Sequence, residues 1–294
     1  MTTDNKNGVF KRQGLTEGEL AEIKTLADAC EAYENLHMKL NWGILRSRPH
    51  DQTNDFLYYE NNVLVGFLAF FNFNPSEGEA SGMVHPERRR RGIFRQLFAA
   101  VCVEARSRSV PTLLLIVEHD SASGQGFAAS VKPAYHHSEY RMELAGAKPL
   151  PPPNPRLHFR LARPDEAPML EHINAVSFDM DESSGTWYGA ENFQNPKKRF
   201  YIAVLDETDE VYVGKLDVSL GAEEAYIAGV GVLPAYQRRG YGRQMIAQTV
   251  HDVLALGQQR IVLEVEANNR NALTLYQSCG FKEVSSFDYY SLSL

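Results

Sequence analysis

Apolar residues recur along the second half of the chain with two different periods. Ile246, Val250 and Val253 lie three or four positions apart, which places them on one face of a helix, and a second helical segment, 268–278, ends at Gly280. Short apolar runs predict strands at 157–161, 199–205, 211–218, 225–233 and 261–266. A strand, a helix and a further strand in this order predict at least one right-handed βαβ unit.

The first half repeats this plan at a fixed offset of 148 residues. The matched pairs are Val84 with Val232, Pro86 with Pro234, Gly92 with Gly240, and Glu118 with Glu266. Because two separate segments keep one register, the sequence indicates two copies of one fold.

A proline-rich stretch separates the two copies. Five prolines lie within residues 145–155, near the midpoint of the 294 residues. Proline fixes φ and removes backbone donors, so this stretch predicts an extended connector. We therefore expect a first domain at 1–148, a linker at 149–155 and a second domain at 156–294.

Composition excludes several classes of protein. The chain is 44% hydrophobic and 23% charged, as ordinary globular proteins are, and its formal charge of −7 argues against nucleic acid or an anionic membrane as a partner. The three cysteines are far apart, and the pair His136-His137 has no third ligand nearby, so we expect neither a disulfide framework nor a metal site. The N-terminus lacks a signal-peptide pattern and the longest apolar run, 63–71, is too short to span a bilayer, so a cytoplasmic location is expected.

One short motif carries most of the chemical information. Gln237-Arg-Arg-Gly-Tyr-Gly242 stands between a predicted strand and a predicted helix, where unpaired N–H groups and the helix dipole favour an anion. Gly240 and Gly242 allow a phosphate to approach the backbone, and the arginines at 238, 239 and 243 add positive charge. The spacing fits neither the Rossmann nor the Walker motif, and it indicates a pyrophosphate ligand.

Together with Asn269-x-x-Ala272, Leu275-Tyr276 and Gly280-Phe281, this motif resembles motifs A and B of the GNAT family of N-acetyltransferases. The resemblance covers 156–294 well and 16–144 more weakly. It implies an α/β (α+β) fold of two tandem GNAT domains, each with a mixed, mostly antiparallel twisted sheet, flanking helices and a splayed pair of parallel strands. It also implies acetyl transfer from acetyl-CoA to a primary amine of a small molecule or peptide by direct attack. The alternative is a non-catalytic module that senses acyl-CoA.

The resemblance also implies roles for single residues. Backbone groups of the strand and of the motif loop would bind the pantetheine arm and the pyrophosphate, and Tyr276 would protonate the leaving thiolate as general acid. The implied cofactor-binding residues are Val230, Gly231, Val232, Gln237, Arg238, Arg239, Gly240, Tyr241, Gly242, Arg243, Asn269 and Tyr276. A strand N–H near Val232 would stabilise the oxyanion.

The acceptor side is less defined by the sequence. A base must take the proton of the acceptor ammonium, and Glu224 is a candidate, with a water-relayed base as an equal alternative. Glu264 and Glu266 share a face of the neighbouring strand. Trp187-Tyr188 and Phe178 either line an acceptor pocket or pack in the core. The acidic balance favours a cationic amine as the acceptor.

The first copy departs from the family pattern. Phe94 stands where a small residue is expected, and Tyr276 pairs with Ala128 or, with a gap, with Ser130. We therefore expect the second copy to be the active one and the first to bind acetyl-CoA weakly or to serve as scaffold. The second candidate cofactor site comprises Met83, Val84, Arg89, Arg90, Arg91, Gly92, Ile93 and Phe94.

Overall fold

The computed structural model describes residues 5–48, 50–149, 154, 156–179, 187–205 and 211–294. Contacts divide the chain into two compact units. Unit 1 comprises Met1–Ser138 together with Ser285–Leu294, and unit 2 comprises Glu139–Val284. The predicted linker at 149–155 lies largely outside the described residues.

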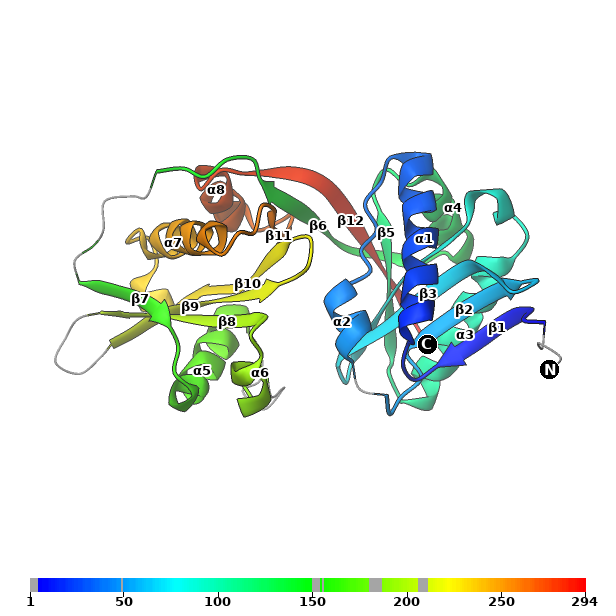
Figure 1. Ribbon diagram of the computed structural model, residues 1–294, viewed down its shortest axis with the longest axis horizontal. Helices are drawn as coiled ribbons and strands as arrows, with labels where there is room; N and C mark the ends of the chain where they lie inside the picture. The colour runs from blue at the N-terminus through cyan, green and yellow to red at the C-terminus, as the bar shows by residue number, and fades with distance from the viewer. Residues whose placement is uncertain (1–4, 49, 150–153, 155, 180–186, 206–210) are drawn as a thin grey trace. The chain divides into compact units, whose positions relative to one another are not determined.

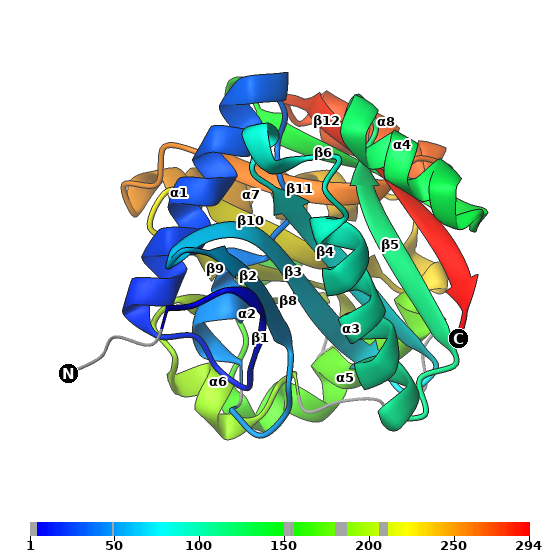
Figure 2. The ribbon, with the colours of Figure 1, turned by 90° about the vertical axis from the view of Figure 1, so that its right-hand side faces the viewer.

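Unit 1 is a mixed sheet between two pairs of helices. Helices α1 (Glu17–Glu34) and α2 (Trp42–Ser47) share one apolar core with the sheet, and α3 (Ile93–Ser107) and α4 (Ala122–Val131) share the core on the other face. Figure 2 shows α3 lying across the strands of this unit. The strand order is β1 (Gly8–Arg12), β2 (Asp55–Glu60), β3 (Val63–Asn74), β4 (Glu77–Val84), β5 (Thr112–Glu118) and the end of β12 (Phe281–Ser293). A 3-10 turn, η1 (Pro86–Arg88), follows β4.

Unit 2 repeats this architecture. Helices α5 (Ala167–Phe178) and α6 (Ala190–Gln194) lie on one face of the sheet, and α7 (Tyr241–Ala255) and α8 (Arg270–Ser278) lie on the other (Figure 1). The strand order is β7 (Leu157–Leu161), β8 (Lys198–Leu205), β9 (Val211–Leu220), β10 (Ala225–Val232), β11 (Ile261–Glu266) and the end of β6 (Ala134–Leu144), with 3-10 turns η2 (Pro164–Glu166) and η3 (Pro234–Tyr236). The predicted mixed, mostly antiparallel sheet with flanking helices is confirmed.

Each unit completes its sheet with a strand from the other half of the sequence. The end of β12 runs antiparallel to β5, from Phe287 opposite Glu118 to Ser293 opposite Thr112. Residues 139–143 of β6 pair antiparallel with β11. The predicted domain boundaries place residues 139–148 in the first domain and residues 285–294 in the second. The contacts instead place residues 139–148 in unit 2 and residues 285–294 in unit 1. An alternating pattern shows that a strand has an apolar face but does not show which sheet edge it joins.

The parallel strand pair of each unit separates partway along its length. In unit 2, β10 and β11 pair only from Ala225 opposite Ile261 to Ile227 opposite Leu263. In unit 1, β4 and β5 pair from Glu77 opposite Thr112 to Ala80 opposite Leu115. The strands continue beyond these points without pairing to each other, so the predicted splay is present in both units.

Unit 2 contains a β-bulge that unit 1 lacks. The register between β10 and β9 shifts between Ala228 and Gly231, and Gly229 within the shift has φ +55°. The corresponding part of β4 pairs with β3 in unbroken register from Gly66 opposite Val84 to Phe71 opposite Glu79. The extra residue makes the bulged strand bend beside the gap between the splayed strands.

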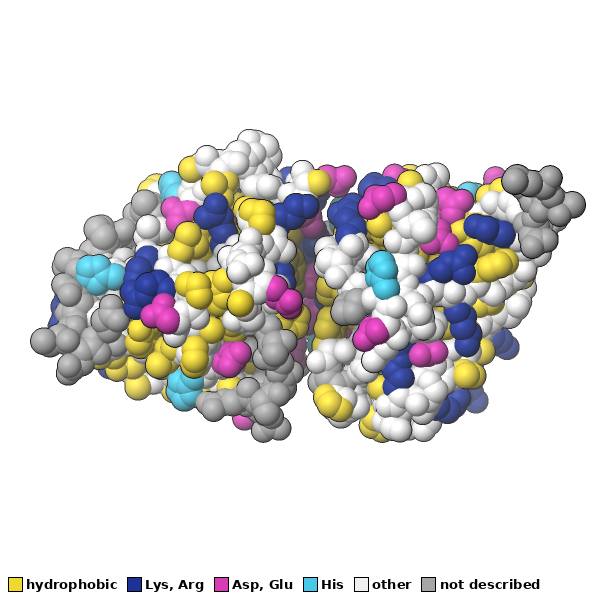
Figure 3. Space-filling view, turned by 60° about the horizontal axis from the view of Figure 1, so that its bottom comes forward, with side chains coloured by type: hydrophobic (Ala, Val, Ile, Leu, Met, Phe, Trp, Pro, Cys, Tyr) yellow, Lys and Arg dark blue, Asp and Glu magenta, His cyan; other side chains and the backbone are white. Residues whose placement is uncertain are grey.

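The surface carries charges of both signs. On the face that Figure 3 shows, Lys and Arg side chains lie interspersed with Asp and Glu side chains and with apolar ones. Among the described helices, none has the length and apolar character needed to cross a membrane.

Candidate functional site

The motif loop of unit 2 forms an anion-binding backbone. Arg238 and Gly240 have positive φ values of +60° and +84°, and Gly240 stands at the N-cap of α7 without a side-chain cap. The first hydrogen bond of the helix runs from the Gln244 amide to the Gly240 carbonyl, at 3.1 Å. The amides of residues 238–243 donate to no group in the described parts of the chain. Such N–H groups and the helix dipole favour an anion, and binding of the pyrophosphate here stays a prediction.

Gln237, the first residue of the motif, closes the loop against the strand. Its side-chain amide donates to the Val232 carbonyl at 3.0 Å, and Arg89 of unit 1 donates to the Val84 carbonyl at 3.1 Å in the same way. Arg239 donates to the Ala235 carbonyl at 3.0 Å. The side chains of residues 237 and 239 therefore shape the loop, while Arg238 and Arg243 are exposed and form no ion pair with any described residue.

Tyr276 lies on α8 with its side chain almost fully buried. The residue is 8% exposed, and its hydroxyl has no hydrogen-bond partner among the described residues. Burial raises the pKa of Tyr276 to about 12, so the phenol is protonated at neutral pH and available as a proton donor. Cys279, one helical turn later, is buried, and burial raises the pKa of its thiol, which makes it unreactive.

Asn269 is the N-cap of α8. Its side-chain oxygen accepts the Ala272 amide at 3.1 Å. The matching residue of unit 1, Ser121, caps α4 by accepting the Gly124 amide at 3.1 Å. The structure thus gives Asn269 a role in helix initiation, and its contact with the cofactor stays a prediction.

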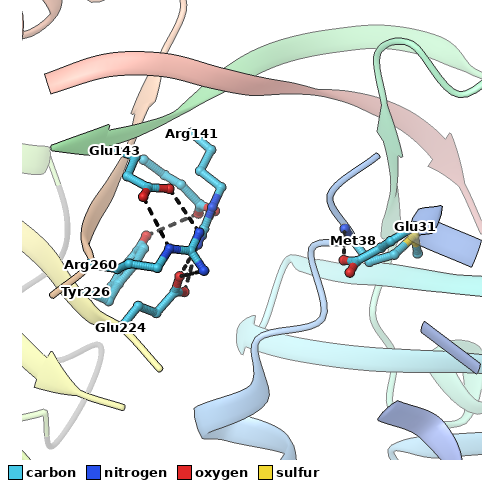
Figure 4. A network of polar contacts seen from close by, with 8 residues as sticks. Glu31, Met38, Arg141, Glu143, Glu224, Tyr226 and Arg260 are labelled. Carbon is cyan, nitrogen blue, oxygen red and sulfur yellow. Dashed lines mark hydrogen bonds and ion pairs between the residues drawn. The ribbon is translucent and has the colours of Figure 1, made fainter. Parts of the chain in front are cut away.

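Glu224, the candidate base from the sequence, is occupied by ion pairs. Both of its carboxylate oxygens accept from Arg141, at 2.7 and 2.6 Å, and Arg260 lies 3.8 Å away (Figure 4). It precedes β10 at the end where β10 and β11 are paired, and five residues of strand, about 16 Å, separate it from Gly229. A carboxylate held by two guanidinium groups and remote from the strand gap is poorly placed to act as base.

Glu264 belongs to the same network. Tyr226 donates its hydroxyl to one Glu264 oxygen at 3.1 Å, and Arg141 lies 3.8 Å from the other. The carboxylates of Glu224 and Glu264 are therefore both held by ion pairs or hydrogen bonds, and neither is a free base (Figure 4).

A buried polar cluster beside the bulge was not predicted from the sequence. Lys215 on β9 is fully buried, and its ammonium lies 2.6 Å from Asp217 Oδ2. Tyr188 donates its hydroxyl to the same oxygen at 2.9 Å and also contacts Lys215. Burial lowers the pKa of Lys215 and raises the pKa values of Asp217 and Tyr188. The sequence feature that could have indicated this cluster is the presence of Lys215 and Asp217, two positions apart, within an otherwise apolar strand.

The neighbouring aromatic residues divide between core and surface. Tyr188 is 4% exposed, whereas Trp187 and Phe178 are 53% and 46% exposed. Of the three, only Tyr188 therefore packs in the core of the described structure.

The corresponding site of unit 1 has the same loop and a different interior. Arg90 and Gly92 have φ values of +64° and +77°. A cavity of about 790 Å³ lies at this loop and at the gap between β4 and β5. Phe94 lines it and packs edge-to-face on Phe127, with 4.6 Å between the ring centroids. Glu34 accepts from Arg89 at 2.7 Å and from the Ser123 hydroxyl at 3.2 Å.

The position of Tyr276 is filled differently in unit 1. Ala128, at the fixed offset, is 3% exposed in the core, and Ser130 donates its hydroxyl to the Phe127 carbonyl at 2.7 Å. Neither residue supplies a phenol, as the sequence predicts.

Comparisons with known proteins agree with this geometry. The sequence profile of the Acetyltransferase (GNAT) family matches residues 20–130 and again residues 167–281. The chain is 29% identical to a mycothiol acetyltransferase of Mycolicibacterium smegmatis, over 94% of this chain and 96% of that protein. It is 28% identical to a mycothiol acetyltransferase of Thermomonospora curvata, over 95% of each chain.

Solved structures share the fold of the whole chain. A GCN5-related N-acetyltransferase from Sphaerobacter thermophilus superposes with a TM-score of 0.79 at 17% identity, over 97% of this chain and 95% of that one. A tandem GNAT protein from the clavulanic acid biosynthesis pathway gives a TM-score of 0.74 at 17% identity, over 97% and 98%. The chain therefore belongs to the GNAT family of N-acetyltransferases and contains the domain of this family twice.

Proposed function

We propose that unit 2 transfers the acetyl group of acetyl-CoA to a primary amine of a small molecule related to mycothiol. The observation that carries the proposal is the motif loop of unit 2. There, consecutive amides that donate to no described residue stand at the end of a splayed, bulged strand. The relatives named mycothiol acetyltransferase align over nearly the whole chain, which supports the choice of acceptor.

The residues of unit 2 fit acetyl-CoA. The amides of residues 238–243 would bind the pyrophosphate, with Arg238 and Arg243 adding charge, and Gly240 has open space where a Cβ would stand. The edge of β10 from Val230 to Val232 would pair with the pantetheine arm, because β11 has left that edge unpaired. Tyr241 and Gly242 begin the helix behind the loop.

Acetyl-CoA supplies an activated acyl group, so the chain needs no nucleophile of its own. The amine attacks the thioester carbonyl, and an N–H of the bulged segment stabilises the oxyanion that develops. Tyr276 gives its proton to the departing thiolate. Asn269 acts through α8, whose first turn it caps.

Unit 1 is proposed as a second, non-catalytic acetyl-CoA site. Met83 and Val84 end the strand beside the cavity, and residues 89–94 form the loop. Phe94 with Phe127 narrows the interior, and Glu34 competes with a phosphate for Arg89. Both features favour weaker binding than in unit 2.

The test is to incubate the full chain with acetyl-CoA and deacetylated mycothiol and to follow product mass and loss of thioester absorbance. Other small primary amines serve as comparison acceptors. Amine-dependent product supports the proposal. Saturable binding of acetyl-CoA without acetylation of any amine would favour the acyl-CoA sensor instead.

A further inference from the structure

The cluster of Lys215, Asp217 and Tyr188 lies directly beneath the bulge of β10. A Cβ at Gly229 would stand 2.6 Å from the Lys215 nitrogen and 2.8 Å from Asp217 Oδ2. A Cβ at Gly231 would stand 2.5 Å from the hydroxyl of Ser177 on α5. Because neither residue has a side chain, the backbone of β10 at Gly229 and Gly231 packs directly against these polar groups, on the sheet face that α5 covers.

Two polar atoms at this point have no hydrogen-bond partner among the residues that the structure describes. Asp217 Oδ1 and Ser177 Oγ are both shielded from solvent, and no described residue donates to or accepts from either atom. Lys215 and Tyr188 both bind the other oxygen of Asp217, Oδ2. The carboxylate is thus held from one side, and the oxygen on its other side lacks a donor. Buried polar atoms are usually paired, so these two point to a polar ligand.

The comparison between the units shows that the fold does not require this cluster. At the offset of 148, Lys215 corresponds to Phe67, Asp217 to Ala69 and Tyr188 to Leu40. The strand registers agree, since Lys215 lies opposite Gly231 and Phe67 lies opposite Met83. Phe67, Ala69 and Leu40 are all fully buried in one apolar core.

Burying an ion pair is a poor way to stabilise a core. The desolvation of two charges offsets most of their attraction, and apolar residues of similar volume are often as stable or more so. Unit 1 has apolar residues at these positions, keeps an unbroken register in the part of β4 that corresponds to the bulge, and has no phenol at the place of Tyr276. Unit 2 combines the ion pair, the bulge and Tyr276. The three features occur together in the unit proposed to be active.

We propose that Asp217 and Ser177 form the subsite for the acceptor's ammonium group and that Asp217 Oδ1 accepts its proton. This inference rests on the proposed amine acetylation by unit 2. The ammonium donates to Oδ1 and to Ser177 Oγ, and one proton passes to Asp217, leaving a neutral amine. The amine nitrogen then bonds to the acetyl carbon as the carbon–sulfur bond breaks. Tyr276 gives its proton to the thiolate, the nitrogen loses its second proton to water, and water returns one proton to the Tyr276 phenolate. Asp217 later releases its proton to water.

The experiment compares two nucleophiles that differ in protonation. Deacetylated mycothiol carries an alkylammonium group that must lose a proton at neutral pH, whereas hydroxylamine is already largely neutral. Asp217→Asn is expected to lower kcat/KM for deacetylated mycothiol at least ~100-fold at neutral pH. The loss should shrink as the pH rises towards the pKa of the acceptor. Acetylation of hydroxylamine should stay within about threefold of the unsubstituted chain, because no base is needed.

Matched variants separate this role from a structural one. Asp217→Asn leaves Lys215 charged and unpaired in the core, so the double variant Lys215→Met/Asp217→Asn provides a neutral cluster if the single variant fails to fold. Asp252→Asn, on α7, removes a carboxylate from the same unit and should leave both activities unchanged.

The outcomes are distinct. Equal losses with both nucleophiles, or no loss with deacetylated mycothiol in a folded variant, would overturn the role of Asp217 while leaving amine acetylation intact. If the unsubstituted chain acetylates neither nucleophile, the proposed function fails and this inference fails with it.

Discussion

Replacement of Phe287 by Ala tests the exchange of strands between the two sequence halves. Phe287 belongs to β12, near the C-terminus of the chain, but its side chain is 1% exposed within unit 1. It packs there with Leu114 and Ile116 of β5 and with Tyr289. The substitution should therefore destabilise unit 1 and leave unit 2, which contains the proposed active site, folded.

The size of the effect follows from the burial of the ring. Truncating a buried Phe to Ala costs about 3–5 kcal/mol, from lost transfer free energy and the cavity left behind. Total unfolding free energies of domains are about 5–15 kcal/mol, so unit 1 would lose a large part of its stability. For a unit of this size the loss corresponds to a fall in Tm of roughly 6–20 °C.

Hydrogen exchange of backbone amides locates the effect. In Phe287→Ala, the amides of β5 should exchange faster, and those of β11 should keep their protection. Val284→Ala provides the control, because Val284 lies on the same strand with 41% of its surface exposed and should cost about 0.5 kcal/mol or less. Faster exchange in β11 than in β5, or a loss of unfolding free energy below about 1 kcal/mol, would refute the pairing described for β12.

Three further changes probe the proposed site and a buried carboxylate. Tyr276→Phe should lower kcat by about 10²-fold or more while the acetyl-CoA Kd, measured by calorimetry, stays the same; unchanged turnover would remove the role of general acid. Gly240→Asp should weaken acetyl-CoA binding by about tenfold or more, because it places a negative charge and a side chain at φ +84° in the anion site, and unchanged affinity would exclude that site. Hydrogen bonds from Arg160 hold the pKa of Glu166 at about 2, below its usual 4.5. The ionised carboxylate therefore contributes about 3 kcal/mol to the free energy of unfolding above pH 4.5, and this contribution is lost as the pH falls towards 2. Urea titrations from pH 2 to 6 should show this slope in the unsubstituted chain and not in Glu166→Gln; identical slopes would contradict the assignment.

The motif loop was predictable because its conformation is local. The sequence spacing placed Gly92 and Gly240 at matching turns, and both have positive φ values at helix N-caps. The order of apolar runs also predicted the strands and helices, and the resemblance to the GNAT family implied the mixed sheet with its splayed pair. Such features depend on a few neighbouring residues and on periodicity, which a single sequence displays.

The exchange of strands and the chemistry of the acceptor side depend on long-range contacts. β6 and β12 have the pattern of sheet strands, but their partners are chosen by edges distant in the sequence. Glu224 looked available as a base because Arg141 comes from β6, whose place beside β11 was not predicted. Lys215 and Asp217 were missed because the bulge that brings Gly229 against them is a feature of register rather than of composition.

The exchange of strands also reverses the order in which the two units can finish folding during translation. Unit 2 needs β6, which precedes the rest of that unit in the chain, so its sheet can close when residues up to 284 have left the ribosome. Unit 1 must wait for residues 285–294, although nearly all of it is synthesised first. Until then the edge of β5 stands open, with Leu114 and Ile116 lacking the cover of Phe287 and Tyr289. An open apolar edge invites wrong pairing, so the nascent first half is the stage at which chaperones would matter most for this chain.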